Sequence, residues 1–217
     1  MEVRKKIIPH GVRGRTTHPY VWVAIPKVAS RSIFYKLIHE TSTEYSTSSP
    51  FQNLQVKPLG EIHKEEFTFT FIREPLERIV SCYLNKVKSG STSLRRRWLQ
   101  DEDVSFEFFI DILSANFFEN GHWAPQVMFL QEIHFDFVGN IGKKSHLNFI
   151  ANKLEISENF PYRNSSTFYG QPSSKDFIKT LSTETKNRIQ KMYSSDYSLL
   201  KNLPASGFYE KEIPSLC

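Results

Sequence analysis

The stretch 20–34 constrains this chain more than any other part of its sequence. A near-continuous apolar run is followed by Pro26, Lys27 and small or hydroxyl residues, and then by a helical pattern. A buried strand that turns sharply into a helix leaves backbone N–H groups at the helix start, where the helix dipole attracts an anion. Lys27 adds a full positive charge at that point. We therefore predict a strand over 21–25, a helix over 32–39 and a phosphate-binding loop between them.

A second strand-to-helix unit follows. Residues 67–72 alternate with period two, which is typical of a strand, and run directly into Arg73, Glu74 and Pro75. Pro75 suits the first turn of a helix, and apolar residues then recur at helical spacing over 76–87. Two such units in succession predict a single α/β domain in which a central parallel sheet is flanked by helices.

The remaining elements are predicted from the same periodicities. They are helices at 106–113, 127–133 and 144–154, a strand at 135–138, and a last helix that Ser182 caps and that runs to Leu200. Residues 1–19 are basic and show no pattern, so we expect an extended lead-in. A length of 217 residues suits one domain with a sizeable core, which we place at 20–217.

The composition, 39% hydrophobic and 24% charged, is that of a soluble globular protein. A net charge of +5 favours anionic partners. The two cysteines, Cys82 and Cys217, do not make a disulfide framework, and Cys82 is expected to be a small buried thiol. No run approaches the roughly 18 apolar residues of a membrane span, and the first 20 residues show no secretory signal. These features predict a soluble, cytoplasmic protein.

The residue order of the first loop differs from the strict P-loop pattern G-x-x-x-x-G-K-[ST], because Lys27 precedes the small residues and the loop has no glycine. The order Pro-Lys-x-small-hydroxyl resembles the 5′-phosphosulfate loop of sulfotransferases, which use 3′-phosphoadenylyl sulfate (PAPS) as donor. Residues 73–83 resemble the 3′-phosphate motif of the same enzymes, R-[DE]-P followed by a serine, here Ser81. A planar guanidinium and a hydroxyl suit a phosphate dianion, and Arg73 ends a strand, where ligands bind in open α/β sheets.

Three further stretches, 120–126, 134–139 and 181–197, are similar to carbohydrate sulfotransferases of the chondroitin 4-O and HNK-1 type, in sulfotransferase family 2. The resemblance covers about residues 20–200. It implies a P-loop kinase-like sulfotransferase fold and in-line transfer of a sulfuryl group from PAPS to a hydroxyl. The acceptor implied is a glycan or other small molecule, the product is 3′-phosphoadenosine 5′-phosphate (PAP), and no metal or nucleic acid takes part. A Golgi location is implied if a targeting segment has been removed.

The resemblance also assigns residues to the donor. Lys27 is assigned to the bridging oxygen of the leaving phosphate. The backbone amides of 28–32 and the side chains of Ser30 and Ser32 are assigned to the 5′-phosphate and sulfonate. Arg73 and Ser81 are assigned to the 3′-phosphate, with Arg163 as a second ligand. The full implied donor set is Lys27, Val28, Ala29, Ser30, Arg31, Ser32, Arg73, Ser81, Arg163 and Ser165.

Within the first loop the chain departs from the wider sulfotransferase pattern at two positions. Ala29 stands in place of the common glycine and allows the backbone less freedom. Arg31 adds a guanidinium that can contact a donor phosphate or an acidic acceptor.

A base is needed to take the proton of the acceptor hydroxyl, and histidine suits this task near neutral pH. Of seven histidines, His122 lies in the family-like block 120–126. His63 precedes the second strand, where the related heparan 2-O-type enzymes keep a histidine. Both stay open as the base, and so does a surface or structural role for either.

Two other functions stay open. A kinase or nucleotide hydrolase with a degenerate P-loop needs a magnesium-holding carboxylate at a strand end, and Glu74 and Asp136 are poor candidates. A non-enzymatic nucleic-acid-binding domain needs clustered basic and exposed aromatic side chains. The aromatic residues here fall mostly on predicted buried faces, and we expect Trp22 and Trp123 to pack in the core. The oligomeric state and the identity of the acceptor do not follow from the residues.

Overall fold

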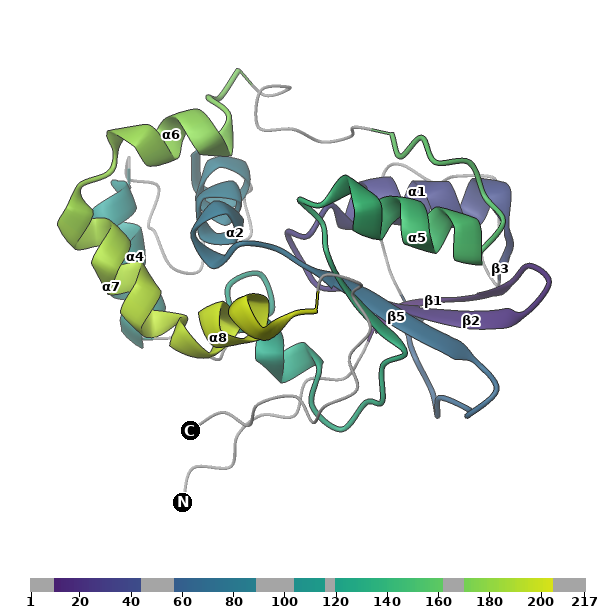
Figure 1. The fold of residues 1–217 in the computed structure, drawn as a ribbon. Helices are drawn as coiled ribbons and strands as arrows, with labels where there is room; N and C mark the ends of the chain where they lie inside the picture. The colour runs from purple at the N-terminus through teal and green to yellow at the C-terminus, as the bar shows by residue number, and fades with distance from the viewer. Residues whose placement is uncertain (1–9, 44–56, 89–103, 116–119, 162–169, 205–217) are drawn as a thin grey trace.

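The structure is a computed structural model that describes residues 10–43, 57–88, 104–115, 120–161 and 170–204 (Figure 1). Arg163 and Ser165, both assigned above to the donor, lie outside the described residues. The same holds for Cys217.

A mixed sheet with the strand order β3-β1-β2-β5-β6 forms the centre of the fold. Its middle is parallel: β2 pairs with β5 at Tyr20↔Phe67, and β5 pairs with β6 at Phe69↔Phe137. β1 runs antiparallel to β2, and the two shortest strands both pair with β1. The strands are β1 (His10–Arg15), β2 (Pro19–Val23), β3 (Ser42–Thr43), β4 (Lys57–Pro58), β5 (Phe67–Ile72) and β6 (Phe137–Asn140). The predicted α/β fold with a parallel central sheet is confirmed, with antiparallel strands added at one side.

The strand β1 lies inside the stretch 1–19, so the prediction of an extended lead-in is wrong for residues 10–15. Two glycines hide the strand pattern in the sequence. A Cβ at Gly11 would lie 1.8 Å from the carbonyl oxygen of Trp22, and one at Gly14 would lie 2.5 Å from the hydroxyl of Tyr20. The close packing of β1 against its neighbours thus requires glycine at positions 11 and 14, where the β-branched or aromatic side chains typical of a strand would not fit.

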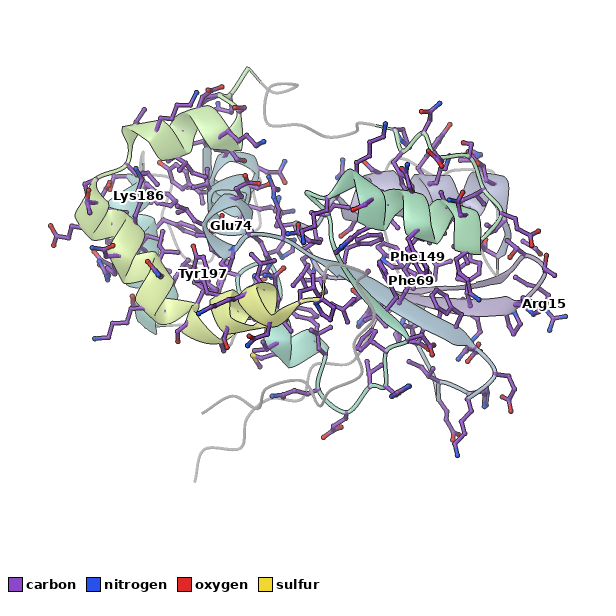
Figure 2. All side chains as sticks on the ribbon, viewed as in Figure 1. Arg15, Phe69, Glu74, Phe149, Lys186 and Tyr197 are labelled. Carbon is purple, nitrogen blue, oxygen red and sulfur yellow. The ribbon has the colours of Figure 1, made fainter. Side chains whose placement is uncertain are left out.

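Two helices, α1 (Ser30–Glu40) and α5 (Lys144–Lys153), lie side by side on one face of the sheet (Figure 1). Phe149 of α5 stacks on Phe137 of β6 with ring centroids 4.7 Å apart. Figure 2 shows Phe149 and Phe69 together between this helix layer and the sheet. Trp22 is 1% exposed in the same core, as predicted. Leu199 and Leu203, at the end of the chain's described part, belong to this core as well.

A second group of helices lies beyond the carboxyl ends of the parallel strands (Figure 1). It has its own apolar core, in which the Tyr83 ring meets the rings of Phe106, Phe109 and Phe177, and which also holds Trp123, packed as predicted. Its elements are α2 (Pro75–Cys82), the π-helix η1 (Tyr83–Lys88), α4 (Phe106–Ala115), α6 (Ser174–Thr180), α7 (Thr183–Met192) and α8 (Ser194–Asn202). A 3-10 helix, η3 (Gln126–Phe129), connects the two groups.

Two predicted helices differ from the observed ones in continuity. The helix over 76–87 changes from α to π geometry at Tyr83. The last helix is capped by Ser182 as predicted, but it breaks at Tyr193. At this break the Tyr193 hydroxyl donates to the carbonyl oxygen of Trp123 at 2.6 Å, a tertiary contact that no local sequence pattern predicts.

We expect Gly11→Ala to destabilise the domain by about 3 kcal/mol, because the added methyl meets rigid backbone across the β1–β2 ladder. Urea unfolding followed by circular dichroism measures this loss. Gly60→Ala is the matched control, since a Cβ at Gly60 meets nothing within 4 Å. Equal stability of the two variants would contradict the pairing of β1 with β2.

Candidate active site

The three parallel strands end at one edge of the sheet, and the predicted donor residues follow two of them. The first loop leaves β2, and Arg73 leaves β5, its direct neighbour. Asn140 ends β6 opposite Ile72. The carboxyl edge of a parallel sheet is where ligands bind in such folds, so the two predicted motifs form one site.

The first loop holds two non-glycine residues in the left-handed region, Lys27 with φ 69° and Ala29 with φ 49°. Ala29 is the N-cap of α1 and occupies the position where the family commonly has glycine. The left-handed backbone explains that preference, because glycine adopts it without cost and alanine does not. The loop therefore keeps its shape at the cost of some strain, which is common at binding sites.

Internal hydrogen bonds close the loop. The hydroxyl of Ser30 donates to the carbonyl oxygen of Ile25 at 2.7 Å, and the amide of Val28 donates to the same oxygen at 3.4 Å. The amide of Ser32 donates to the carbonyl oxygen of Ala29 at 2.9 Å, and the Ser32 side chain is buried. These contacts shape the loop, and they use the Ser30 hydroxyl within it.

Lys27 is a largely buried cation whose Nζ donates to Oδ1 of Asn85 on η1. Burial lowers its pKa from 10.5 to about 8, and repulsion from Lys86, Arg31 and Arg73 acts in the same direction. Cys82 would raise this pKa only as a thiolate, and burial raises the pKa of Cys82 itself. Several positive groups thus lie near one another, and no carboxylate of the described residues forms an ion pair with Lys27, an arrangement that favours binding of an anion.

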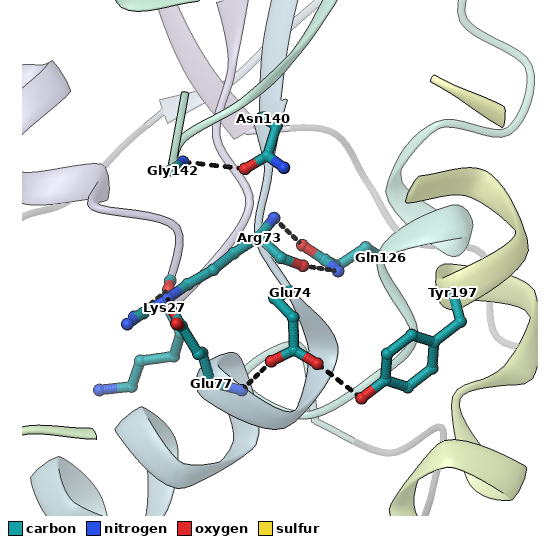
Figure 3. Close-up of polar contacts among 8 residues, drawn as sticks. All are labelled: Lys27, Arg73, Glu74, Glu77, Gln126, Asn140, Gly142 and Tyr197. Atoms are coloured by element: carbon teal, nitrogen blue, oxygen red, sulfur yellow. Dashed lines mark hydrogen bonds and ion pairs between the residues drawn. The ribbon is translucent and has the colours of Figure 1, made fainter. Parts of the chain in front are cut away.

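Arg73 lies next to this lysine, half-buried, and Figure 3 shows its side chain extending toward Lys27. Its Nη1 donates to the carbonyl oxygen of Lys27 at 3.4 Å, and its Nε to Glu77 at 3.3 Å. The backbone of Arg73 is held by Gln126, whose amide accepts from the Arg73 N–H and donates to the Arg73 carbonyl oxygen, both at 2.8 Å. The arginine is therefore fixed at its backbone while its guanidinium makes only long contacts.

The residues that hold Arg73 in place were missed in the sequence. Asp196 of α8 is fully buried and accepts from the backbone N–H of Gln126 at 2.8 Å and of Val127 at 3.0 Å. The neighbouring Tyr197 donates to Glu74 at 2.6 Å, and Glu74 caps α2 (Figures 2 and 3). Asp196 and Tyr197 could have been noticed in the sequence, because neither belongs to the apolar pattern that predicts their helix.

His122 lies in a turn against the same cluster, with a partly exposed ring. Its Nδ1 and its backbone N–H both lie 2.9 Å from Oδ1 of Asn120. Because the backbone N–H can only donate, this oxygen accepts, and Nδ1 carries the ring proton. Burial, with repulsion from Lys86, Lys27 and Arg78, lowers the pKa of His122 to about 3. The ring is therefore neutral at physiological pH, with Nε2 as its basic nitrogen.

His63 lies at the opposite end of β5. Its backbone N–H donates to Glu66, which directly precedes the strand, whereas Arg73 follows the strand. Six residues of extended chain separate these ends by roughly 16 Å or more. The structure thus places His122 within the electrostatic influence of Lys27, Lys86 and Arg78, whereas the exposed His63 lies at the other end of the strand from Arg73.

Ser81 and Arg31 complete the described part of the predicted donor set. Ser81 lies six residues after Pro75 in α2, roughly 9 Å along the helix axis, and is partly buried. Arg31 is exposed in the first turn of α1.

The described residues contain neither a metal-binding cluster nor a membrane-spanning helix. No three histidine, cysteine, aspartate or glutamate side chains converge there as a metal site would require. Within the same ranges, none of the helices combines the length and the apolar character of a bilayer span.

The structure thus defines an α/β protein in which the loops that carry Lys27 and Arg73 meet at the carboxyl edge of a parallel sheet. The model of the sulfotransferase family matches residues 13–201, and the chain belongs to this family. The family prediction made from the two loops is thereby confirmed.

The relatives are carbohydrate sulfotransferases. Carbohydrate sulfotransferase 11 of Rattus norvegicus is 23% identical over 223 residues, covering 83% of this chain and 63% of that protein. Carbohydrate sulfotransferase 14 of Danio rerio is 22% identical over 237 residues, covering 90% and 63%. The human carbohydrate sulfotransferase 14 is 35% identical over 92 residues, or 34% of this chain. The chain thus spans just under two thirds of the length of the first two. No solved structure matches it.

We expect Lys27→Met to raise the free energy of unfolding at pH 7 by up to roughly 3 kcal/mol, because the pKa shift from 10.5 to about 8 reflects an unfavourable buried charge. Between about pH 8 and 10.5 the unfolded chain binds this proton more readily than the folded chain, so the stability of the wild type rises with pH in that range. The stability advantage of Lys27→Met over the wild type therefore disappears by about pH 10.5. Urea titrations at pH 7 and 10 measure both effects. Exposed Lys144→Met is the control, and a destabilised Lys27→Met would contradict the desolvated charge.

Proposed function

We propose that this chain transfers the sulfuryl group of PAPS to a hydroxyl of a carbohydrate acceptor. The observation that carries the proposal is the contact of the Arg73 guanidinium with the carbonyl oxygen of Lys27, which joins two cationic residues that follow neighbouring parallel strands, near a neutral histidine. The relatives' names point to carbohydrate as the acceptor class.

In the proposed reaction the acceptor oxygen attacks sulfur, the bond from sulfur to the phosphate oxygen breaks, and PAP leaves with that electron pair. Lys27 lies at the loop centre, where its ammonium neutralises charge on the leaving oxygen. For this it exchanges the Asn85 oxygen for the phosphate oxygen. The amides of Ala29, Ser30 and Arg31 hold the 5′-phosphate and sulfonate at the start of α1. The hydroxyl of Ser30 supports the loop through Ile25.

Arg73 and Ser81 take the 3′-phosphate in this proposal. The weak contacts of the Arg73 guanidinium, at 3.3 and 3.4 Å, leave it ready to turn to a stronger acceptor. Its backbone stays fixed by Gln126 meanwhile. Arg163 and Ser165 remain proposed donor ligands on sequence grounds alone.

His122 is the proposed base. Its Nδ1–H is held by Asn120, so Nε2 can accept the hydroxyl proton as the oxygen attacks. The pKa of about 3 reflects burial first and then the uncompensated cations of the empty site. A bound polyanion offsets Lys27, Lys86 and Arg78, which raises the proton affinity of His122 when the donor is in place.

The alternative of a kinase or nucleotide hydrolase finds little support in the two carboxylates that it needs. Glu74 caps α2 and accepts from Tyr197. Asp136 accepts from the amide of Thr68 near the start of β5, at the other end of the strand from Arg73. The Glu74 carboxylate is thus engaged by contacts within the protein, and Asp136 lies far from the loop of Lys27.

The donor assignment predicts a preference for PAP over AMP, which lacks the 3′-phosphate. Arg73→Ala should weaken PAP binding by roughly 10- to 100-fold, the loss of a charge-assisted hydrogen bond, and change AMP binding little. Isothermal titration calorimetry without metal measures both constants. Arg188→Ala, on α7 and bound to Asp111, is the control. A wild-type chain that prefers ATP with magnesium to PAP would refute the proposal.

The base assignment predicts that His122→Gln lowers the turnover of labelled PAPS with a glycan panel by roughly 10²–10⁴-fold, while PAP affinity stays near the wild-type value. His63→Gln, at the far end of β5, should keep full turnover. Because His122 of the empty site is neutral down to low pH, wild-type kcat/KM, which reports the free enzyme, should not fall on acidification near pH 6.5. Retained turnover in His122→Gln would show that another group takes the proton.

A further inference from the structure

The guanidinium of Arg78 connects two separate loops of the site. Arg78 is fully buried in α2. Its Nε donates to the carbonyl oxygen of Pro26 at 3.0 Å, its Nη1 to that of Ala124 at 2.8 Å and its Nη2 to that of Gly121 at 3.0 Å. The first carbonyl directly precedes the loop lysine, and the other two lie on either side of the candidate base in its turn.

The chemistry of this contact is unusual for a buried arginine. Burying a charge is costly unless it is well hydrogen-bonded, and a guanidinium most often meets a carboxylate. Here each of the three nitrogens meets a backbone carbonyl, and the buried Asp196 attracts the charge without an ion-pair contact while it binds the amides of Gln126 and Val127. The rigid planar fork of arginine fixes three acceptors relative to one another, which a lysine or an apolar side chain does not do.

We infer that Arg78 is a positioning residue that sets the distance and orientation between Lys27 and His122. The inference rests on the proposed function for the roles of those two residues, while the connection itself rests on the contacts of Arg78. In-line transfer needs the leaving-group cation and the base on opposite sides of the sulfur. A displacement of about 1 Å between them costs on the order of 100-fold in rate.

Sequence reasoning gives Arg78 no such role, because it looks like one more charge on an amphipathic helix. Its place in the helix is informative in hindsight. It lies three residues after Pro75 and directly before the buried Ile79 and Val80, so it faces the interior and not solvent.

The first test uses the free, full-length chain and hydrogen exchange read by mass spectrometry. In Arg78→Lys, which keeps the charge and loses the fork, we expect exchange in peptides covering 26–31 and 120–125 to accelerate together by roughly tenfold. Peptides from β5 and α5 should keep wild-type exchange, as should the whole chain in the control Arg188→Lys. Unchanged exchange, acceleration in only one of the two loops, or a uniform acceleration would overturn the inference.

The second test asks whether the connection serves the reaction. PAP added to the wild-type chain should shift the imidazole nitrogen signals of His122 in NMR spectra. In Arg78→Lys, PAP should still bind within roughly tenfold of wild-type affinity, while the His122 shift is largely lost and turnover falls by on the order of 100-fold. A role in core packing alone would leave the His122 response to bound PAP intact, and that result would overturn the inference.

The two tests separate this inference from the proposed function. Failure of wild-type chain to bind PAP refutes the proposed function, and the exchange data on the two loops still decide whether Arg78 connects them. If Arg78→Lys does not fold, Arg78→Gln is measured in its place, with Asp196 unchanged so that its bonds to the amides of Gln126 and Val127 stay intact. The same joint acceleration of both loops is expected from it, and its absence counts against Arg78.

Discussion

The parallel pairing of β2 with β5 is the constraint on which the rest of the structure depends. It places the end of one strand, with Lys27, next to the end of the other, with Arg73. An antiparallel pairing of the same two sequences would send these cations to opposite ends of the sheet. The parallel arrangement requires a crossover, and α1 supplies it while its N-terminus faces the same edge.

The parts of the fold that a local pattern encodes could be predicted from the sequence. The strand 67–72 alternates cleanly and is observed at those residues, and Pro75 begins a helix as its chemistry requires. β1 could not be predicted, because glycines stand where its neighbours approach too closely for side chains. The break at Tyr193 could not be predicted either; the tyrosine hydroxyl there donates to a carbonyl oxygen 70 residues away in the chain, and the periodicity of a sequence does not reveal such a contact.

The candidate site divides in the same way. Residues that would touch the donor follow strand ends, so Lys27 and Arg73 could be found from the sequence. The residues that position those groups make contacts between parts of the chain that are distant in sequence. Gln126 hydrogen-bonds the backbone of Arg73, Asp196 accepts from the amide of Gln126, and Arg78 donates to the carbonyl oxygen of Ala124. The proposal of His122 rather than His63 as the base likewise depends on the topology. His63 precedes β5 and Arg73 follows it, so the direction of this strand keeps the two residues apart.

The division of the protein into two apolar cores has a consequence for its folding. One core belongs to the sheet with α1 and α5, the other to the helices around Tyr83, and the site lies where they meet. A nucleotide held by the loop after β2 and by the start of α2 would touch both. Binding of such a ligand would stabilise the association of the two cores. The ligand-bound chain should then unfold more cooperatively than the ligand-free chain.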